Sequence, residues 1–212
     1  MLRVNEIYKS IQGESSYAGL LFGLVRLTGC NLRCRYCDTR FAWEEGEGME
    51  LPEIMERIES LDVGNVLVTG GEPLTQRETP KLLAQMIERD WTTLLETNGS
   101  LDIDLAPRGV IRIVDFKTPG SGCHEANDWR NVERLTPEDE VKFVIASRED
   151  YEWSCGKMRN YSLNDLCEVL FSAADGFLHH RDLAEWIIRD SLPVRMQVPL
   201  HRAIWPDRKR GT

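Results

Sequence analysis

The chain has 212 residues, of which 42% are hydrophobic and 29% charged, and its formal net charge is −9. This length and composition fit one globular domain and exclude a disordered chain or a membrane bundle. The acidic balance argues against nucleic-acid binding, because such binding depends on a basic face that releases counterions from phosphates. No apolar run is long enough for a signal peptide or a membrane span, so we expect a cytoplasmic protein without a membrane partner.

Short apolar runs alternate along the chain with segments of helical periodicity, which indicates strands and helices in turn. The predicted strands are Gly23–Thr28, Asn65–Thr69, Thr92–Thr97, Ile111–Lys117, Val141–Ala146, Glu168–Ser172 and Val194–Val198. The predicted helices are Pro52–Leu61, Pro80–Arg89 and Leu183–Ile188. Such alternation predicts right-handed crossovers and a mostly parallel sheet. The chain is shorter than the roughly 250 residues of a complete eight-unit barrel. We therefore predict an α/β fold, a partial, open TIM-like barrel, as a single domain over residues 1–212.

In a parallel sheet of this kind the functional loops lie at the carboxyl ends of the strands. A loop with three cysteines follows the first predicted strand, and Gly70–Pro73 follows the second. Asn98–Gly99 follows the third strand, and Lys117 stands at the end of the fourth. The residue types that carry chemistry therefore gather at the edge of the sheet where a site is expected.

Three of the six cysteines, Cys30, Cys34 and Cys37, stand within eight positions. They are too close together to pair with one another, and a domain of this size does not need disulfides. A reduced, metal-binding use is the better interpretation. A structural zinc site needs four ligands and a fully ligated iron–sulfur cluster needs four cysteines. Three cysteines in one loop would leave one iron of a cluster open to an outside ligand.

The alternative is a zinc site that a further residue completes, as in a non-catalytic, zinc-stabilised binding module. The residues that could complete it are Cys123, His124, Cys155, Cys167 and His201. Cys155 and Cys167 have no second metal ligand near them at the spacing of a metal site. Cys123 beside His124 is therefore the best of these candidates. We expect that Cys123, Cys155 and Cys167 are not needed to hold a cluster.

The C-x-x-x-C-x-x-C spacing, with the aromatic Tyr36 before the last cysteine, resembles that of radical S-adenosylmethionine enzymes. Further matching segments follow in the same order: Ile11–Glu14, Arg26, Gly29–Leu32, Cys37–Thr39, Thr69–Pro73, Glu96–Gly99, Asp115–Pro119, Val141–Val144 and Gln197–Thr212. Together they resemble the 7-carboxy-7-deazaguanine synthase family of queuosine and 7-deazapurine biosynthesis over essentially the whole chain. The chain departs from the family at Tyr36, where tryptophan is common, and at Ser15 and Ser16, where glycine is frequent.

The resemblance implies a radical S-adenosylmethionine core and a carbon–nitrogen lyase. Such an enzyme converts 6-carboxy-5,6,7,8-tetrahydropterin to 7-carboxy-7-deazaguanine with loss of ammonia. A 5′-deoxyadenosyl radical abstracts hydrogen, and Mg²⁺ assists the ring contraction. The implied cofactors are a 4Fe–4S cluster on Cys30, Cys34 and Cys37, S-adenosylmethionine on the open iron, and Mg²⁺ on Thr39. No catalytic side chain is predicted, because the cofactors carry the chemistry.

The resemblance also implies the binding residues. Those for S-adenosylmethionine are Tyr36, Cys37, Asp38, Gly71, Glu72, Asp115, Phe116, Lys117 and Lys142. Those for the substrate are Ile11, Gln12, Gly13, Glu14, Arg26, Thr69, Gln197, His201 and Thr212. Glu72 or nearby carbonyls would receive the methionine ammonium. Arg26 lies within a predicted strand, where a charge needs a partner; that partner is an internal carboxylate or the carboxylate of the substrate.

The basic C-terminal tail, about residues 197–212, is expected to close over the active site, as the resembled family folds this end over its substrate. An external one-electron reductant of the flavodoxin or ferredoxin type and a homodimer are further implications of the resemblance. The nearest alternative enzyme is a glycyl-radical activating enzyme of the same superfamily. It would lack the small-substrate set that includes Gln12, Arg26 and Thr39.

Overall fold

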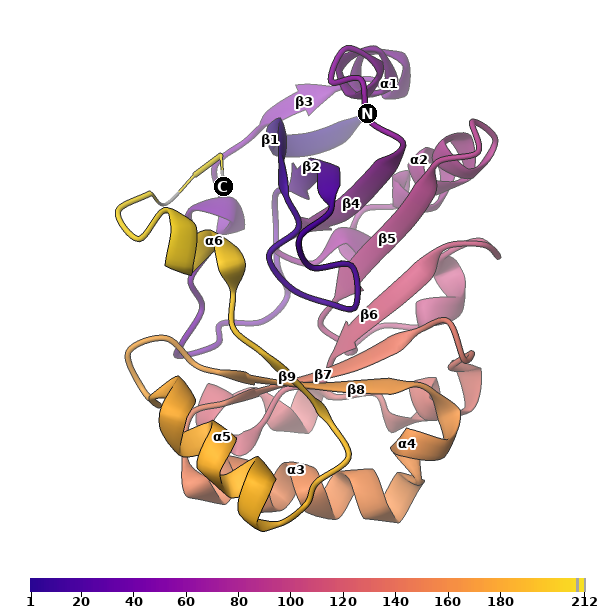
Figure 1. Cartoon of the computed structure of the whole chain (residues 1–212). Coiled ribbons are helices and arrows are strands. Elements are labelled where there is room, and N and C mark those ends of the chain that lie inside the picture. The colour runs from indigo at the N-terminus through magenta and orange to yellow at the C-terminus, as the bar shows by residue number, and fades with distance from the viewer. Residues whose placement is uncertain (209, 212) are drawn as a thin grey trace.

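The structure, a computed structural model, describes residues 1–208, 210 and 211 (Figure 1). One sheet of nine strands has the order β3-β1-β2-β4-β5-β6-β7-β8-β9. The strands are β1 (Leu2–Ile11), β2 (Leu21–Leu27), β3 (Glu47–Met49), β4 (Asn65–Gly70), β5 (Thr92–Thr97), β6 (Ile111–Asp115), β7 (Glu140–Ile145), β8 (Glu168–Ala173) and β9 (Arg195–Gln197). Neighbouring strands from β2 to β9 are parallel, whereas β1 is antiparallel to β2 and β3. Because β3 and β9 are the two edges, the sheet stays open, which confirms the predicted partial barrel.

The longer helices cover the outer face of the curved sheet, and the short C-terminal helix lies on its inner side (Figure 1). The helices are α1 (Leu51–Glu59), α2 (Thr79–Ile87), α3 (Arg148–Tyr161), α4 (Leu163–Leu166), α5 (His180–Arg189) and α6 (Leu200–Ile204). Short 3-10 helices are η1 (Arg40–Trp43), η2 (Pro73–Thr75), η3 (Ile103–Leu105), η4 (Pro119–Ser121), η5 (His124–Ala126) and η6 (Trp129–Arg134). Figure 1 shows α1 and α2 beside the first strands of the sheet, α3 and α5 beside the last ones, and α6 on the opposite, inner side. None of the described helices is long and apolar enough to cross a membrane.

Strand alternation divides the core between the two faces of the sheet. Val66 and Val68 of β4 pack outward in one cluster with the buried side chains of α1 and α2. Leu67, between them, packs inward with Leu24 of β2 and Leu94 of β5. The inner cluster forms the floor below the carboxyl ends of the strands, so it supports whatever binds there.

All seven strands and three helices predicted from the sequence are present, with no end shifted by more than three residues. The strand β1 was missed because polar residues interrupt its apolar positions, and it is stabilised instead by pairing with both β2 and β3. The helix α3 was also missed, since charged residues and Gly156 obscure its apolar stripe. Its N-terminus is capped by Ser147, whose hydroxyl accepts from the Asp150 N–H at 3.2 Å.

Candidate active site

A pocket of about 250 Å³ opens at the carboxyl ends of the parallel strands. Six consecutive parallel strands, β2 and β4 to β8, each place at least one polar residue in its wall; these residues include Arg26, Thr69, Glu96, Asp115, Lys142 and Ser172. The cysteine loop and the first residues of α6 complete the wall. The edge of the sheet predicted to carry the site therefore does form the pocket.

The cysteine loop lies across this pocket, and Cys30, Cys34 and Cys37 all line it. The Leu32 N–H donates to the Cys30 sulfur at 3.4 Å, and the Asn98 amide approaches that sulfur at 3.9 Å. Burial raises the pKa of all three thiols, that of Cys34 to about 12. Because an iron–sulfur cluster takes thiolates, binding would release these protons. Among the described residues, no three His, Cys, Asp or Glu side chains are grouped to hold a single metal ion.

Gly70 and Gly71 bring the end of β4 against the start of the cysteine loop. A Cβ on Gly71 would lie 2.1 Å from the Gly29 carbonyl oxygen and 2.9 Å from the Cys30 Cβ. A Cβ on Gly70 would lie 2.1 Å from the Leu27 oxygen, and the φ of Gly70 is +146°. Only glycine fits this close approach, so the pair fixes where the cysteine loop leaves the sheet.

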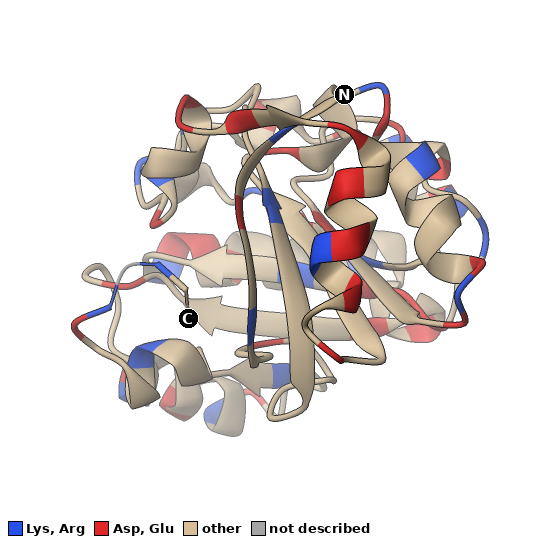
Figure 2. Cartoon of the chain, turned by 90° about the horizontal axis from the view of Figure 1, so that it is seen from above, with Lys and Arg blue, Asp and Glu red and all other residues tan. Residues whose placement is uncertain are grey.

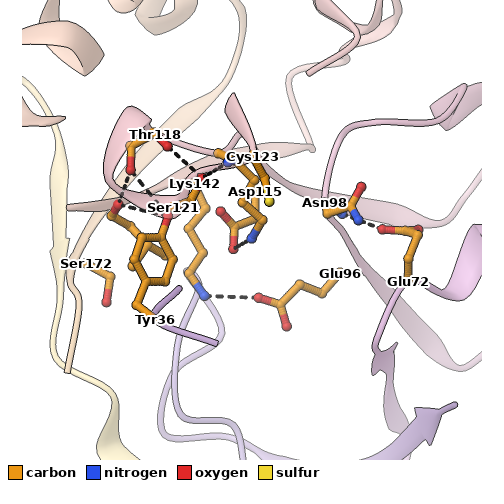
Figure 3. A network of polar contacts seen from close by, with 12 residues as sticks. Tyr36, Glu72, Glu96, Asn98, Asp115, Thr118, Ser121, Cys123, Lys142 and Ser172 are labelled. Carbon is orange, nitrogen blue, oxygen red and sulfur yellow. Dashed lines mark hydrogen bonds and ion pairs between the residues drawn. The ribbon is translucent and has the colours of Figure 1, made fainter. Parts of the chain in front are cut away.

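Glu72 corrects one sequence-based expectation. Its carboxylate is completely buried and accepts from the Leu74 N–H at 3.0 Å, the Thr97 hydroxyl at 2.9 Å and the Asn98 N–H at 2.6 Å. It does not line the pocket, and Figure 3 shows it next to Asn98, away from the lysine network. With these donors already bound, Glu72 ties β4 to β5 and is not placed to receive an ammonium group.

Phe116 is a second correction. Its side chain is fully buried in the outer core, where it stacks on Trp129 with ring centroids 4.6 Å apart. It does not line the pocket, so its part at the site is limited to main chain.

An ionic centre of one lysine and two glutamates lies in the pocket wall. The Lys142 ammonium is 2.7 Å from a Glu14 carboxylate oxygen. It is also 3.0 Å from an oxygen of Glu96 (Figure 3). The Thr69 hydroxyl donates to the other Glu96 oxygen at 3.0 Å, and the Ser172 hydroxyl donates to Glu14 at 3.2 Å. Although burial opposes ionisation, Lys142 brings the pKa of Glu96 to about 2. Burial also works against the charge of Lys142, but Glu14 and Glu96 raise its pKa, so Lys142 and Glu96 are both charged at neutral pH.

Asp115 and Lys117 form a second pair beside the cysteine loop. Their charged atoms are 2.8 Å apart, and although burial works against it, Asp115 raises the pKa of Lys117. The other Asp115 oxygen is buried and has no partner among the described residues. A buried acceptor without a donor fits a hydroxyl or amino group of a bound cofactor. Tyr36 stands opposite, its hydroxyl 3.3 Å from that of Thr118 (Figure 3).

Arg26 has the internal carboxylate that its place in a strand required. Its guanidinium is 2.7 Å from a Glu6 carboxylate oxygen and donates to the Tyr8 hydroxyl at 3.0 Å. The side chain also lines the pocket. The internal partner is thus confirmed, and contact with a substrate carboxylate stays a prediction.

The start of the C-terminal tail packs against the loop after β1. The Leu200 N–H donates to the Gly13 oxygen at 3.0 Å, and a Cβ on Gly13 would lie 2.4 Å from the His201 ring. Burial lowers the pKa of His201, which favours the neutral imidazole in the pocket wall. Gln197 is buried at the end of β9 and does not line the pocket, and Thr212 lies outside the described residues.

Arg202 joins this tail to two loops across the pocket mouth. Its guanidinium is 3.5 Å from a carboxylate oxygen of Asp38 and 4.0 Å from one of Asp175. Further along, Arg210 pairs with Glu45, and the Gly211 N–H donates to Glu6 at 3.2 Å. These pairs hold the described tail beside the predicted magnesium residue, Thr39.

Five residues that line the pocket had been given no role from the sequence: Glu96, Asn98, Ser172, Asp175 and Arg202. Glu96 and Asn98 belong to a matched segment, so their position after a buried strand was the available signal. No signal in the sequence marked Ser172 or Asp175, because their position at the pocket depends on the pairing of β8 with β7. The predicted residues that do line the pocket are Ile11, Gln12, Gly13, Glu14, Arg26, Thr69 and His201 for the substrate, and Tyr36, Cys37, Asp38, Gly71, Asp115, Lys117 and Lys142 for S-adenosylmethionine.

Residues 24–115 match the family model of the Radical SAM superfamily. The 7-carboxy-7-deazaguanine synthase of Chlorobaculum tepidum is 44% identical over 99% of this chain and 97% of that protein. The chain belongs to the 7-carboxy-7-deazaguanine synthase family. The member from Koribacter versatilis is 37% identical over 99% of this chain and 100% of that protein. Members of this family are radical S-adenosylmethionine enzymes, so a 4Fe–4S cluster and S-adenosylmethionine are the cofactors that the family implies.

Solved structures agree on the fold of this 7-carboxy-7-deazaguanine synthase family member. QueE from Escherichia coli superposes with a TM-score of 0.76 at 19% identity, over 93% of this chain and 94% of that one. SuiB from Streptococcus suis bound to S-adenosylmethionine gives 0.55 at 12% identity, over 82% of this chain and 45% of that one. Family membership sets aside both the glycyl-radical activating enzyme and the zinc-stabilised module.

Proposed function

We propose that this enzyme converts 6-carboxy-5,6,7,8-tetrahydropterin to 7-carboxy-7-deazaguanine with release of ammonia. The observation that carries the proposal is the pocket wall, in which six parallel strands present polar side chains to one space beside three cysteines. A flat heterocycle with a carboxylate and several amide-like edges needs such a ring of donors and acceptors. The relatives named 7-carboxy-7-deazaguanine synthase, which align over nearly the whole chain, support the same reaction.

The cofactor residues fit their groups. Cys30, Cys34 and Cys37 would hold the cluster, and the unpartnered oxygen of Asp115 offers an acceptor to S-adenosylmethionine. When bound, these cofactors supply a 5′-deoxyadenosyl radical that abstracts hydrogen from the substrate. The protein's part is to hold the pterin still and to exclude water.

The charged residues would orient the pterin. Arg26 keeps its charge through Glu6 and presents it to the pocket, where it attracts the substrate carboxylate. Glu14 and the amide of Gln12 are placed to meet the amino and carbonyl edges of the ring. Lys142 holds Glu14 by an ion pair at 2.7 Å, which fixes the direction of that acceptor.

We propose Mg²⁺ at Thr39. The Thr39 hydroxyl lines the pocket and donates to an Asp38 oxygen at 2.8 Å. A hydroxyl beside a carboxylate is a set of hard oxygen donors, and magnesium takes few protein ligands when substrate oxygens complete its shell. Magnesium here would orient the substrate carboxylate electrostatically.

The remaining proposals concern the whole chain. Residues 1–212 act as a single domain whose tail, from about residue 197, closes over the bound substrate. The contacts of His201 with Gly13 and of Arg202 with Asp38 support that closure. A one-electron donor of the flavodoxin or ferredoxin type reduces the enzyme, and the enzyme acts as a homodimer in the cytoplasm.

Anaerobic reconstitution with iron and sulfide tests the proposal. Dithionite, S-adenosylmethionine, Mg²⁺ and the pterin are added, and products are identified by chromatography and mass spectrometry. We expect 7-carboxy-7-deazaguanine and ammonia in equal amounts. If only methionine and 5′-deoxyadenosine appear, the substrate assignment is wrong while the superfamily chemistry stands.

A further inference from the structure

Glu6 of β1 reaches the pocket side of the sheet because its strand has an irregular register. Val4 pairs with Leu27 of β2. Glu6, two residues later, pairs with Arg26, the neighbour of Leu27, so the register shifts by one residue. In an unshifted register Glu6 would face Val25, which packs in the outer core. Directly opposed residues of antiparallel strands share one face, so the shift re-aims the Glu6 carboxylate to the side of Arg26.

The two carboxylate oxygens of Glu6 accept from two distant parts of the chain. Oε1 is 2.7 Å from the Arg26 Nε, and Oε2 accepts from the Gly211 N–H at 3.2 Å. The side chains of Arg26 and Glu6 are only 14% and 17% exposed, so their ion pair is partly shielded from water. Glu6 thus connects an arginine of the pocket wall to the end of the C-terminal tail.

The contact with Glu6 leaves part of the Arg26 guanidinium for a ligand. Its Nε donates to Glu6, and its Nη2 donates to the Tyr8 hydroxyl at 3.0 Å. In the part of the chain that the structure describes, the Nη1 of Arg26 donates to no acceptor, and this side chain lines the pocket. Because the guanidinium is a rigid fork, fixing two of its nitrogens also fixes the direction of the third.

The end of the tail lies in the same region as Arg26. This end is basic, and Figure 2 shows basic residues next to the C-terminal label. Arg210 pairs with Glu45, and its guanidinium lies 4.4 Å from the centroid of the Phe41 ring. The Arg26 guanidinium lies 5.8 Å from the same centroid. Two carboxylates, those of Glu6 and Glu45, therefore hold the end of the tail beside the arginine.

We propose that Glu6 is a positioning residue that couples the binding of the substrate carboxylate at Arg26 to the closure of the tail. One of its oxygens directs the guanidinium, and the other holds the tail at Gly211. Since the two contacts share one carboxylate, a closed tail favours pterin binding, and bound pterin favours the closed tail to the same extent. The inference rests on the proposed function, because it needs a substrate carboxylate at Arg26.

The test uses enzyme reconstituted anaerobically, with S-adenosylmethionine, Mg²⁺ and 6-carboxy-5,6,7,8-tetrahydropterin but without a reductant, so that no turnover occurs. Equilibrium binding gives the affinity for the pterin, and hydrogen–deuterium exchange follows the tail. Glutamine has one acceptor oxygen, so E6Q can keep only one of the two contacts. E6D keeps the charge beside Arg26 but draws both oxygens back by one methylene. The control E47Q removes an exposed carboxylate of β3 that pairs with Arg57 and does not line the pocket.

We expect saturating pterin to slow exchange in the tail of the wild type and of E47Q. E6Q should bind the pterin on the order of tenfold more weakly, and saturating pterin should no longer slow exchange at the end of its tail. E6D should lie between the two. Exchange in β4 and β5 without pterin shows whether each variant is folded.

Wild-type affinity in E6Q would overturn the proposal. Weaker binding with full protection of the tail at saturation would also overturn it, because the two contacts would then be independent. If E6Q does not fold, the same two outcomes in E6D decide. A folded wild-type enzyme that binds no pterin would instead overturn the proposed function.

Discussion

Two carboxylates beside neighbouring strands behave differently: Glu72 is fully buried, whereas the Glu96 side chain is 27% exposed. Glu72, after β4, accepts three neutral donors and serves as a brace between loops. Glu96, at the end of β5, faces the pocket and pairs with Lys142. Adjacent residues of β5 point to opposite sides, so Glu96 reaches the pocket while Thr97 reaches Glu72. A carboxylate that is fully buried among neutral donors supports the fold, whereas one that faces a pocket beside a cation is available for binding.

Of the residues compared here, Glu72 should contribute most to the free energy of unfolding. In Glu72→Ala, the Leu74 and Asn98 N–H groups and the Thr97 hydroxyl lose their acceptor inside the protein. We expect the free energy of unfolding to fall by about 3 kcal/mol or more, measured by urea denaturation. Glu72→Gln keeps the shape and part of the bonding, so its loss should be smaller. If Glu72→Ala is as stable as the wild type, Glu72 does not stabilise the contact between the two loops.

Breaking the ionic centre should cost less stability and more activity. Lys142→Met leaves Glu14 and Glu96 without their cation. Because both carboxylates are partly exposed, we expect a loss of about 2 kcal/mol, less than for a fully buried pair. Turnover should fall at least tenfold. The double variant Lys142→Met/Glu96→Gln should recover part of the stability, because it removes one of the unpaired charges. Strictly additive losses would show that the pair is not coupled.

The pH dependence of the free energy of unfolding tests the ion pair between Glu96 and Lys142. The pKa of Glu96 is about 2 in the folded protein, below its ordinary 4.5, so the unfolded chain binds its proton first. Its contribution to stability is complete above pH 4.5 and is lost as the pH falls toward 2. Urea denaturation at several pH values should show a shallower acid decline in Glu96→Gln than in the wild type. Parallel declines would contradict the ion pair.

The smallest effect on stability should come from the tail. Arg202 is partly exposed in its pairs with Asp38 and Asp175, so Arg202→Gln should change the free energy of unfolding by less than about 1 kcal/mol. If the tail closes over the pterin, the KM should rise several-fold with little change in kcat. Arg195→Gln, which breaks an exposed pair with Glu168 away from the pocket, is the matched control. An unchanged KM in Arg202→Gln would show that this contact of the tail does not contribute to substrate binding.

Much of the site was predictable because it depends on local sequence. The cysteine spacing and the buried strands are short-range features, and each stands where it was expected. The roles of Glu72 and Phe116 were not predictable, since either could turn toward the pocket or the core. Tertiary packing determines the orientation of these two side chains, and both are buried in the interior.

The sequence by itself determined the parallel sheet, the side of it that carries the chemistry and the three-cysteine loop. Hydrophobic periodicity and ligand spacing involve residues that are close together in the sequence, so they can be recognised without a structure. The tertiary structure decided which charges meet. Lys142 and Glu14 are 128 positions apart and Arg202 and Asp38 are 164 apart, and their pairing depends on the open barrel curving β1, β7 and the tail around one pocket.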